Sequence, residues 1–583
     1  MKIKNAIEFP PILGTSIQLS SAHDLDAIRK ELDHWQKENR MQGLWNKDAS
    51  LWTNHDEARW MGWLDVAKEE NEIVEIEKLA NEMKDKLNDI VLMGMGGSSL
   101  CPAMMASIFS KVKNFPQLHI LDSTDPLQIK NLESKLDMKR TLFIVSSKSG
   151  TTLEPNIFKD YFYQQLQKVL NKTEVGDRFI AITDPGTALE KAAKQANFKH
   201  IFYGVPSIGG RYSALSNFGM VPSALMGVNI RDFLHQAELM AEACGADHSG
   251  EDNPGLVLGV ILGVYARQGQ NKITFVATPA IQSLGAWLEQ LLAESTGKEG
   301  KGLVPIDLEP LANPDDYGQD RLFVYIRLET QADAEQDRKI EKLIEAGFMV
   351  TTINFSDRMH LGAELFRWEM ATAIVGSMLG INPFNQPDVE ESKILTLQLT
   401  VDYDKSHQLA EQKSFFSSQG ISLFTDDINL AELKARTRDP SLQNYLQAHL
   451  SRIKQGDYVD LSAFIAMSDE NMDLLQESRV LIRDHKKVAT CLGFGPRFLH
   501  STGQLYKGGA NNGVFLQITA DHHEDIKIPG HEYTFGLVIR AQAQADFTVL
   551  AKRGRRVLRI HLGDEVVEGL QNLQRVLQEI FIR

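Results

Sequence analysis

The sequence predicts an α/β protein with two parallel-sheet lobes, a helical arm before them and a further α/β lobe at the C-terminus. Short apolar runs alternate with segments that repeat apolar residues at helical spacing, which is typical of parallel sheets covered by helices. The chain has 583 residues, more than a single hydrophobic core usually serves. With 43% hydrophobic and 24% charged residues, it has enough apolar side chains to fill several cores.

Residues 1–80 are expected to form the helical arm, because dense charge alternates with apolar positions over Asp24 to Asn39 and Glu57 to Lys86. Five tryptophans are close together in this arm: Trp35, Trp45, Trp52, Trp60 and Trp63. Such a group more often packs on a core than forms a binding platform. We therefore expect the arm to pack against the body of the protein.

The first lobe is predicted over residues 81–249. Its strands are expected at four apolar runs: Ile90 to Met93, Leu118 to Leu121, Thr141 to Val145 and Phe179 to Thr183. Helical segments separate these runs, so the strands should be parallel. Polar residues that follow the strands should then meet at the carboxyl edge of the sheet, where ligands bind in such folds.

The second lobe is predicted over residues 250–400, after a polar boundary at Gly250 to Gly255. Its strands are expected at Ile273 to Val276, Leu322 to Ile326 and Met349 to Ile353. Residues 401–467 are polar, and we interpret them as a mostly helical connector.

The C-terminal lobe, residues 468–583, repeats features of the second lobe. Val488-Ala489-Thr490 followed by Leu499-His500 echoes Val276-Ala277-Thr278 followed by Ala293-Glu294. Phe515 to Ile518 echoes Phe323 to Ile326. The spacing drifts by tens of residues. Two interpretations follow: a degenerate third copy of the lobe, or chance similarity between α/β units.

The bulk composition excludes some classes of function. The formal net charge is −15 and the pI is about 5.6, which argues against a general binder of nucleic acids or anionic membranes. The cysteines, Cys101, Cys244 and Cys491, lack metal-site spacing and fit a reducing cytosol. No signal peptide is evident, and the apolar run Leu256 to Tyr265 is too short to cross a bilayer. We expect a cytoplasmic protein.

The most informative segment is Ser146 to Thr152, which follows the apolar run Leu142 to Val145. It contains five hydroxyls and one ammonium, and a helix is expected to start near Thr152. Free N–H groups at a helix start, together with hydroxyls and a lysine, suit the oxygens of a phosphate monoester. The alternative is a Ser/Thr-rich turn with a helix cap. We favour the phosphate interpretation.

Two glycine turns also carry polar groups. Gly94 to Ser99 resembles a dinucleotide fingerprint but has Ser99 where the third glycine belongs. A second donor loop fits better, with Ser98 donating to a sugar or phosphate. The turn Ser207 to Ser213 presents Arg211, which could hold an oxyanion or, alternatively, cap the turn.

Two further segments contain candidate site residues. Glu294 lies at the end of an apolar helical stripe, where it would suit a general base or be an ordinary helix-end glutamate. After the loop Asn382 to Pro387, Gln386 and Lys393 are seven residues apart and lie on one helix face. The alternative for Lys393 is an exposed, solubilising lysine.

Taken in order, GMGGSS, SSKSGTT, SIGGRYS, ESTGK and NPFNQPDVEESK resemble the glucose-6-phosphate isomerase family over about residues 85–400. SIGGRYS is specific to that family, whereas SSKSGTT is shared by sugar-isomerase (SIS) domains. The resemblance implies two SIS-type three-layer αβα lobes with parallel sheets. The tail containing PRFLHSTGQLYKGG is similar to the isomerase half of fused transaldolase–glucose-6-phosphate isomerase proteins, which suggests a functional link to a transaldolase.

The resemblance implies an isomerase that interconverts glucose 6-phosphate and fructose 6-phosphate through a cis-enediol intermediate. Glu294 would move the proton between C2 and C1, Arg211 would stabilise the enediolate and Lys393 would assist at the ring oxygen. The implied substrate-binding residues are Gly97, Ser98, Ser147, Lys148, Ser149, Thr152 and Gln386. One base and one cation suffice for this reaction, so we expect no metal and no redox cofactor.

The chain departs from the family pattern at the histidine that opens the sugar ring. No histidine occurs between Ser295 and Met359, and Asp315 is roughly where one is expected. His360 is nearest in sequence. His500, in Leu499-His500-Ser501-Thr502-Gly503-Gln504, is similar to the missing residue's surroundings in some bacterial members, and we favour it.

Other functions remain as alternatives. One is a non-catalytic SIS regulator that binds a sugar phosphate, which would have no use for a base at Glu294. Another is an isomerase of a different aldose phosphate such as mannose 6-phosphate. An aminosugar SIS enzyme would need an ammonia-producing domain or an imine-forming lysine, and neither is evident. The family resemblance implies a homodimer with shared sites.

Overall fold

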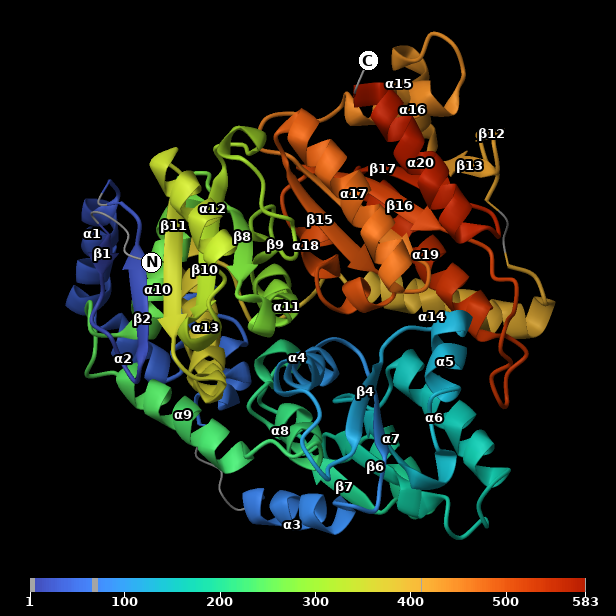
Figure 1. Cartoon of the computed structure of the whole chain (residues 1–583), viewed down its shortest axis with the longest axis horizontal. Helices are drawn as coiled ribbons and strands as arrows, with labels where there is room; N and C mark the ends of the chain where they lie inside the picture. The colour runs from blue at the N-terminus through green and yellow to red at the C-terminus, as the bar shows by residue number, and fades with distance from the viewer. Residues whose placement is uncertain (1–5, 22, 66–71, 410–411, 582–583) are drawn as a thin grey trace.

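The computed structural model describes residues 6–21, 23–65, 72–409 and 412–581. It contains three sheets, each made largely of parallel strands and flanked by helices (Figure 1). The predicted α/β class is therefore confirmed.

The first sheet belongs to the first lobe and has the order β4-β3-β5-β6-β7, all parallel. Its strands are β3 (Asp89–Gly94), β4 (Gln117–Leu121), β5 (Thr141–Ser146), β6 (Phe179–Thr183) and β7 (His200–Tyr203). The helices of this region are α4 (Leu100–Phe109), α5 (Pro126–Glu133), α6 (Leu153–Gln167), α7 (Ala188–Gln195), α8 (Asn217–Leu225) and α9 (Ile230–Ala243). Alternate strand residues enter two different buried clusters, Val91 and Phe143 in one, Ile90 and Leu142 in the other. Both faces of the sheet are thus covered, which gives three layers.

The second sheet has the order β1-β2-β11-β10-β8-β9. Its parallel strands are β8 (Lys272–Ala277), β9 (Val304–Ile306), β10 (Arg321–Leu328) and β11 (Met349–Phe355). The helices of this lobe are α10 (Pro254–Arg267), α11 (Leu284–Thr296), α12 (Ala334–Glu345) and α13 (Leu361–Leu379). The predicted strands of both lobes are confirmed.

The N-terminal arm is not wholly helical, which corrects the prediction for residues 1–80. Strands β1 (Ile7–Glu8) and β2 (Thr15–Leu19) form a hairpin, and β2 pairs antiparallel with β11 of the second sheet. The cause is the alternation of buried and half-buried residues along β2, a period of two that suits a strand. Helices α1 (Leu25–Lys37), α2 (Arg40–Trp45) and α3 (Ile73–Met83) follow. Residues 1–5 and 66–71 of the arm lie outside the described residues.

The tryptophans of the arm pack on the body, as expected. Trp35 and Trp63 are fully buried, and Trp52 is 8% exposed. All three belong to the largest hydrophobic cluster, which also contains residues of α9, α10 and α13. The arm is therefore part of the core that supports the second lobe.

The third sheet has the order β12-β13-β17-β16-β14-β15. Its strands are β12 (Phe416–Ser418), β13 (Ile421–Phe424), β14 (Tyr458–Phe464), β15 (Ala489–Phe494), β16 (Gly513–Thr519) and β17 (Arg556–His561). The helices are α14 (Glu390–Ser406), α15 (Asp427–Arg436), α16 (Leu442–Leu450), α17 (Asp469–Lys486), α18 (Gly503–Gly508), α19 (Phe535–Lys552) and α20 (Val566–Phe581).

The predicted helical connector over 401–467 is wrong in part, because β12, β13 and β14 lie within it. β14 is central in the third sheet, yet Asp460 and Ser462 interrupt its apolar run. Both residues are buried, and Asp460 accepts hydrogen bonds from Ser462 and from the Tyr506 hydroxyl. Buried polar groups satisfied in this way leave a strand that reads as polar in sequence.

The second and third sheets share one topology. In each, the four parallel strands lie in the order fourth, third, first, second along the chain, and an antiparallel hairpin is added beside the fourth strand. The first sheet has the same order of its first four strands. This agreement supports a third copy of the lobe rather than chance similarity.

The residue pairs of the predicted echo need one correction. Val488 to Thr490 was matched with Val276 to Thr278, but β15 lies at the sheet edge and pairs with β14 alone, whereas β8 is central. The counterpart of β8 is therefore β14. The match of β16 with β10 agrees with the topology.

The third lobe packs against both of the others. Arg497 donates two hydrogen bonds to Asp122, which follows β4 of the first lobe. Glu309 of the second lobe is fully buried, pairs with Arg321 at 2.7 Å and accepts from the backbone N–H of Thr490. The segment between β15 and α18 is thus held at the junction of three lobes.

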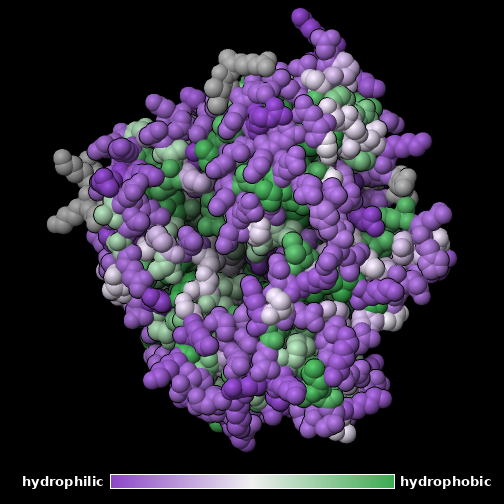
Figure 2. Space-filling view, turned by 45° about the vertical axis from the view of Figure 1, so that its right-hand side comes forward, coloured by the Kyte–Doolittle hydropathy of each residue, from purple (hydrophilic) through white to green (hydrophobic). Residues whose placement is uncertain are grey.

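The surface in Figure 2 is covered mainly by hydrophilic residues, with hydrophobic ones in scattered patches. Within the part of the chain that the structure describes, no helix is long and apolar enough to cross a membrane.

Candidate active site

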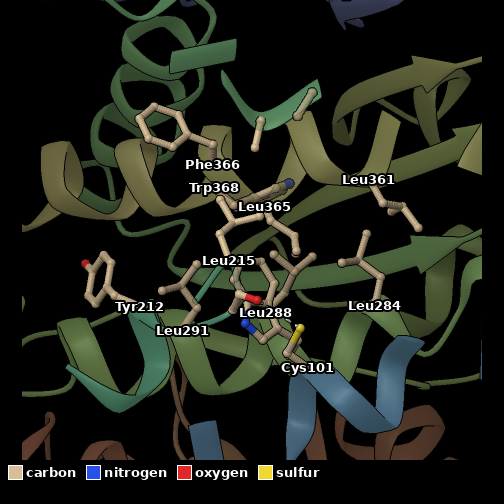
Figure 3. Packing of buried hydrophobic residues seen from close by; sticks show 14 of the residues in the cluster. Cys101, Tyr212, Leu215, Leu284, Leu288, Leu291, Leu361, Leu365, Phe366 and Trp368 are labelled. Atoms are coloured by element: carbon tan, nitrogen blue, oxygen red, sulfur yellow. Dashed lines mark hydrogen bonds between the residues drawn. The ribbon is translucent and has the colours of Figure 1, made fainter. Parts of the chain in front are cut away.

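Helix α11 places Glu294 at the junction of the lobes. Its residues Leu284, Leu288 and Leu291 lie on one face, following the helical period, and point toward α13 (Figure 3). There they meet buried side chains of α13 that include Leu361, Leu365 and Trp368. This apolar contact fixes the helix, so its last turn and Glu294 have a defined position.

The end of α11 also touches the third lobe. Ala293 shares a buried cluster with Phe498 and Leu505, which flank His500. A Cβ atom added at Gly297 would lie 2.3 Å from the Cα of Leu505, so this close approach requires glycine.

Glu294 is a partly enclosed carboxylate with two polar neighbours. Its side chain is 13% exposed. Oε2 accepts a hydrogen bond of 2.9 Å from Gln290 Nε2, one helical turn earlier, and Oε1 lies 3.6 Å from Arg211. Gln290 also donates to the backbone carbonyl of His500 at 2.8 Å. Gln290 therefore links the predicted base to the segment that contains the predicted ring-opening histidine.

Arg211 is buried and holds several elements together. Nε donates to Ser295 Oγ at 2.6 Å, and Nη1 donates to Gln386 Oε1 at 3.0 Å. Nη2 donates to the carbonyls of Pro383 and Asn385. A guanidinium has five N–H groups, so these four bonds leave one on Nη1, the nitrogen nearest Glu294. That N–H has no hydrogen-bond acceptor among the described residues.

A lysine that the sequence reasoning missed helps to hold the loop that carries Gln386. Lys298 is 3% exposed and donates to the carbonyl of Asn382. Burial and the nearby Arg211 guanidinium lower the pKa of Lys298 well below its ordinary value. Its position in ESTGK, directly after the Gly297 contact, was the available signal.

The glycine turn of the first lobe lies against these residues. A Cβ at Gly97 would be 1.9 Å from the carbonyl oxygen of Gly210, next to Arg211. Gly96 has φ +53°, and a Cβ there would be 2.7 Å from the carbonyl oxygen of His500. These contacts require glycine. They bring GMGGSS, SIGGRYS and the His500 segment together, with Ser98 buried among them.

A cavity of about 440 Å³ opens beside this group. Its walls come from the segment Ser146 to Thr152, which we call the phosphate loop, from α14 and from the third lobe. Five predicted site residues line it: Ser149, Thr152, Gln386, Lys393 and His500. Thr152 is the N-cap of α6, which confirms the expected helix start. Free N–H groups at that start and the hydroxyls of Ser149 and Thr151 face the cavity as anion donors.

The remaining predicted residues do not line this cavity. Arg211 contacts the lining residue Gln386 directly. Glu294 is connected to the lining residue His500 through Gln290. Gly97, Ser98 and Ser147 are buried, and Ser147 donates to Thr152 at 3.3 Å. The two groups therefore form adjoining parts of one region.

Lys148 is the clearest departure from the sequence prediction. Its ammonium pairs with Asp184, and the carbonyls of Val205 and Pro206 lie 3.4 Å away. It does not line the cavity. Asp184 comes directly after β6, the strand that pairs with β5. Its carboxylate therefore neutralises the Lys148 charge that we expected to bind the phosphate. Hydroxyl and N–H donors therefore dominate this loop.

His500 faces the cavity and is paired with Glu154. His500 Nε2 lies 3.1 Å from Glu154 Oε1, which also accepts 2.6 Å from Gln542 Nε2. Burial opposes ionisation of Glu154, but the charges of His500 and Lys393 and the hydrogen bond from His500 hold its pKa below its ordinary value. A carboxylate that orients an imidazole in this way is a common arrangement for acid–base catalysis.

Glu154, like Gln542 and Lys507, was not predicted as a site residue. Glu154 follows directly from SSKSGTT at the start of α6, so its place beside the loop was the available signal. Lys507 lines the cavity but pairs with buried Asp546 at 2.6 Å. Gln542 and Lys507 come from the third lobe. Lys507 lies in the tail motif PRFLHSTGQLYKGG, whereas Gln542 lies outside every segment that carried the resemblance.

The other two ring-opening candidates lie elsewhere. His360 precedes α13 and packs against Gly14 of the arm. Asp315 is exposed in the 3-10 helix Pro314–Asp316, between β9 and β10. Neither lines the cavity. Lys393 does line it, with a side chain that is 45% exposed and 3.9 Å from Glu390.

The chain is similar in sequence to known proteins. A family model described as phosphoglucose isomerase matches residues 61–304. The chain is 27% identical over 427 residues to the glucose-6-phosphate isomerase of Parabacteroides distasonis, covering 65% of this chain and 94% of that protein. It is 28% identical over 392 residues to that of Carboxydothermus hydrogenoformans, covering 57% and 82%.

Solved structures show the same fold. A glucose-6-phosphate isomerase from Chlamydia trachomatis aligns with a TM-score of 0.55 at 19% identity, covering 70% of this chain and 91% of that one. A hypothetical protein from Thermus thermophilus aligns with a TM-score of 0.57 at 22% identity, covering 67% and 99%.

The fold and the site define a protein of the SIS class, with a carboxylate–arginine pair beside a hydroxyl-rich loop. Within that class, the chain is similar to the phosphoglucose isomerase family, whose model matches residues 61–304.

Proposed function

We propose that this protein is an aldose–ketose isomerase that interconverts glucose 6-phosphate and fructose 6-phosphate. One observation supports this most: Glu294, Arg211 and the His500–Glu154 pair converge beside the phosphate loop. Relatives at 27–28% identity are glucose-6-phosphate isomerases. A regulator that only binds sugar phosphate would have no use for this acid–base equipment.

The proposed reaction starts with binding of the phosphate group by the N–H groups and hydroxyls near Thr152. His500 then gives a proton to the ring oxygen, the anomeric hydroxyl gives its proton to a water molecule, and the bond between the anomeric carbon and the ring oxygen breaks, which opens the ring. Glu154 positions the imidazole through its 3.1 Å contact. Lys393, on the same cavity wall, is placed to assist at the ring oxygen.

Isomerisation of the open chain needs a single base. Glu294 takes the proton from C2 of the aldose and returns it to C1, while a hydroxyl proton moves between O2 and O1. The charge of the intermediate cis-enediolate falls on these oxygens. The remaining N–H of Arg211 stabilises it, and this stabilisation is larger in an enclosed site than in water.

All these groups come from one chain. The phosphate loop and Glu154 belong to the first lobe, Glu294 to the second and His500 to the third. A homodimer and a link to a transaldolase stay predictions. We also propose a cytoplasmic location, supported by the free, buried state of Cys101, Cys244 and Cys491.

The test is incubation of the purified chain with fructose 6-phosphate, without added metal, and an assay for glucose 6-phosphate. Formation of glucose 6-phosphate is expected. Its absence, with fructose 6-phosphate still bound, would favour the regulator. Mannose 6-phosphate in a parallel assay tests the wider aldose range.

A further inference from the structure

A second cavity, of about 1080 Å³, lies on the third lobe away from the catalytic residues. It opens at the carboxyl ends of β16 and β17, where Thr519 and His561 end these strands. The carboxyl ends of parallel strands are where open α/β sheets bind ligands. Small-molecule sites commonly measure about 300–1,000 Å³, so this space is large enough for a sugar phosphate or a nucleotide.

Arg559 lines this cavity and is only 9% exposed. Its guanidinium donates to Gln517 at 2.7 Å, to the carbonyl of Ala543 at 3.0 Å and to Gln412. All these acceptors are neutral. Among the residues that the structure describes, no carboxylate lies within 4.0 Å of it. A buried cation without a countercharge is costly, and a bound anion would supply that charge.

The nearest acidic neighbour is already engaged. Asp546 pairs with Lys507 at 2.6 Å and accepts from Gln517 at 3.2 Å. Burial lowers the pKa of Arg559 to about 10, which Asp546 only partly opposes. The guanidinium is still charged at neutral pH. It lies over the Phe547 ring at 4.6 Å, but no described carboxylate pairs with it directly.

Arg540 supplies a second cation to the same wall. It is exposed, lies on α19, and has no acidic partner within 4.0 Å among the described residues. Among the described residues that line this cavity, the acidic one is Asp521, which lies 3.3 Å from His561. Among the described lining residues, Arg540 and Arg559 thus outnumber the carboxylate of Asp521, which already contacts His561. Thr519 and Ser406 add hydroxyls to the lining.

We propose that this cavity is a second binding site, which takes a phosphate monoester of a small metabolite. Arg559 and Arg540 hold the phosphate, and the hydroxyls and amides of the lining contact the organic part. Helices α14 and α19 line both cavities, with Lys393 and Gln542 on the catalytic side and Tyr403 and Arg540 here. The second ligand therefore contacts the helices that complete the catalytic cavity.

The experiment is calorimetric titration of the full chain with inorganic phosphate, AMP and ribose 5-phosphate. At least one monoester should bind more tightly than inorganic phosphate. Arg540→Gln should weaken that binding about tenfold, the usual loss for one charge-assisted bond. Arg438→Gln, which removes an exposed arginine from a loop outside the cavity, should leave it unchanged. Tighter binding of AMP than of ribose 5-phosphate would identify a nucleotide, and similar binding a sugar phosphate.

Two further variants separate this site from the catalytic cavity. Arg559→Gln should weaken binding more than Arg540→Gln; where it fails to fold, the exposed Arg540 decides the test. Ser149→Ala with Thr152→Val should leave this binding intact. The proposal is overturned by binding that is lost only in the Ser149/Thr152 variant, by arginine variants that bind like wild type, or by monoesters no tighter than inorganic phosphate.

Discussion

The second and third lobes have the same strand order and the same added hairpin, but they contribute different groups to the site. The second lobe presents Glu294 at the end of a long helix buried against α13. The third presents His500 in a short segment that is held by contacts to the first lobe through Arg497 and Glu154. In the proposed mechanism, the second lobe supplies the base that takes a proton from carbon and the third lobe supplies the acid that protonates the ring oxygen. Mutation should separate these two functions.

The largest effect is expected at Glu294. Glu294→Gln should lower kcat for fructose 6-phosphate by at least about 10³-fold, because the reaction then lacks its one base. Sugar-phosphate binding should remain within a few-fold of wild type. Steady-state kinetics and calorimetry measure both. The control is Glu299→Gln, an exposed neighbour, which should be silent. Near-normal turnover of Glu294→Gln would show that Glu294 is not the base.

His500→Ala should lower kcat for the cyclic substrate by about 10²-fold, the usual contribution of one acid–base group. The expected cause is slow ring opening, which stopped-flow measurement with pure anomers detects. His360→Ala is the matched control and should be kinetically mild, because His360 does not line the cavity. Equal losses in both variants would contradict the assignment.

Glu154 should act through His500. Glu154→Gln should reduce turnover of the cyclic substrate by about tenfold, and combining it with His500→Ala should add little to the loss from His500→Ala alone. Residues that act as one unit are non-additive in such a cycle. Additive losses in kcat would show that Glu154 has a role of its own.

The phosphate loop should depend on hydroxyls more than on its lysine. Ser149→Ala with Thr152→Val should raise KM for fructose 6-phosphate by about tenfold, since each hydrogen bond contributes about 0.5–1.5 kcal/mol. Lys148→Ala should raise KM less, because Asp184 already neutralises the ammonium. A larger rise in KM for Lys148→Ala would show that Lys148 binds the phosphate group.

The third lobe contains a buried carboxyl, Asp460, that should make the stability of the protein depend on pH. Burial raises the pKa of Asp460 in β14 to about 7. A carboxyl whose pKa is higher in the folded state contributes less stability as pH rises from its unfolded pKa to its folded pKa. The thermal midpoint of wild type should therefore fall between pH 5 and 7, and Asp460→Asn should fall less. An identical slope in both proteins would contradict the buried position of Asp460.

The sequence predicted the fold wherever strands are apolar throughout. The runs of β3, β5 and β6 are buried on both faces, so their composition alone marks them. β14 was missed because Asp460 is satisfied by tertiary partners that no local pattern reveals. β2 was not predicted, although buried and half-buried residues alternate along it. The dense charge of the segments that follow it favours helix for the whole arm.

The sequence indicated which residues come together at the site, but not which partners they bond to. Glu294, Arg211, Gln386 and His500 do come together, since each lies in a distinctive segment. The direction of the Lys148 side chain depends on Asp184, 36 residues later, which the motif alone cannot indicate. Lys298 donates to a carbonyl 84 residues later in its own lobe, and Gln542 acts across lobes; such contacts follow from packing rather than from spacing.

The most direct test of the division between lobes uses 5-deoxyfructose 6-phosphate, which cannot close a ring through O5. Exchange of its C1 proton in deuterated water, followed by NMR, reports enolisation without ring opening. We expect His500→Ala to exchange at nearly the wild-type rate and Glu294→Gln to show no exchange above background. Exchange that survives in Glu294→Gln, or that is lost in His500→Ala, would contradict the account.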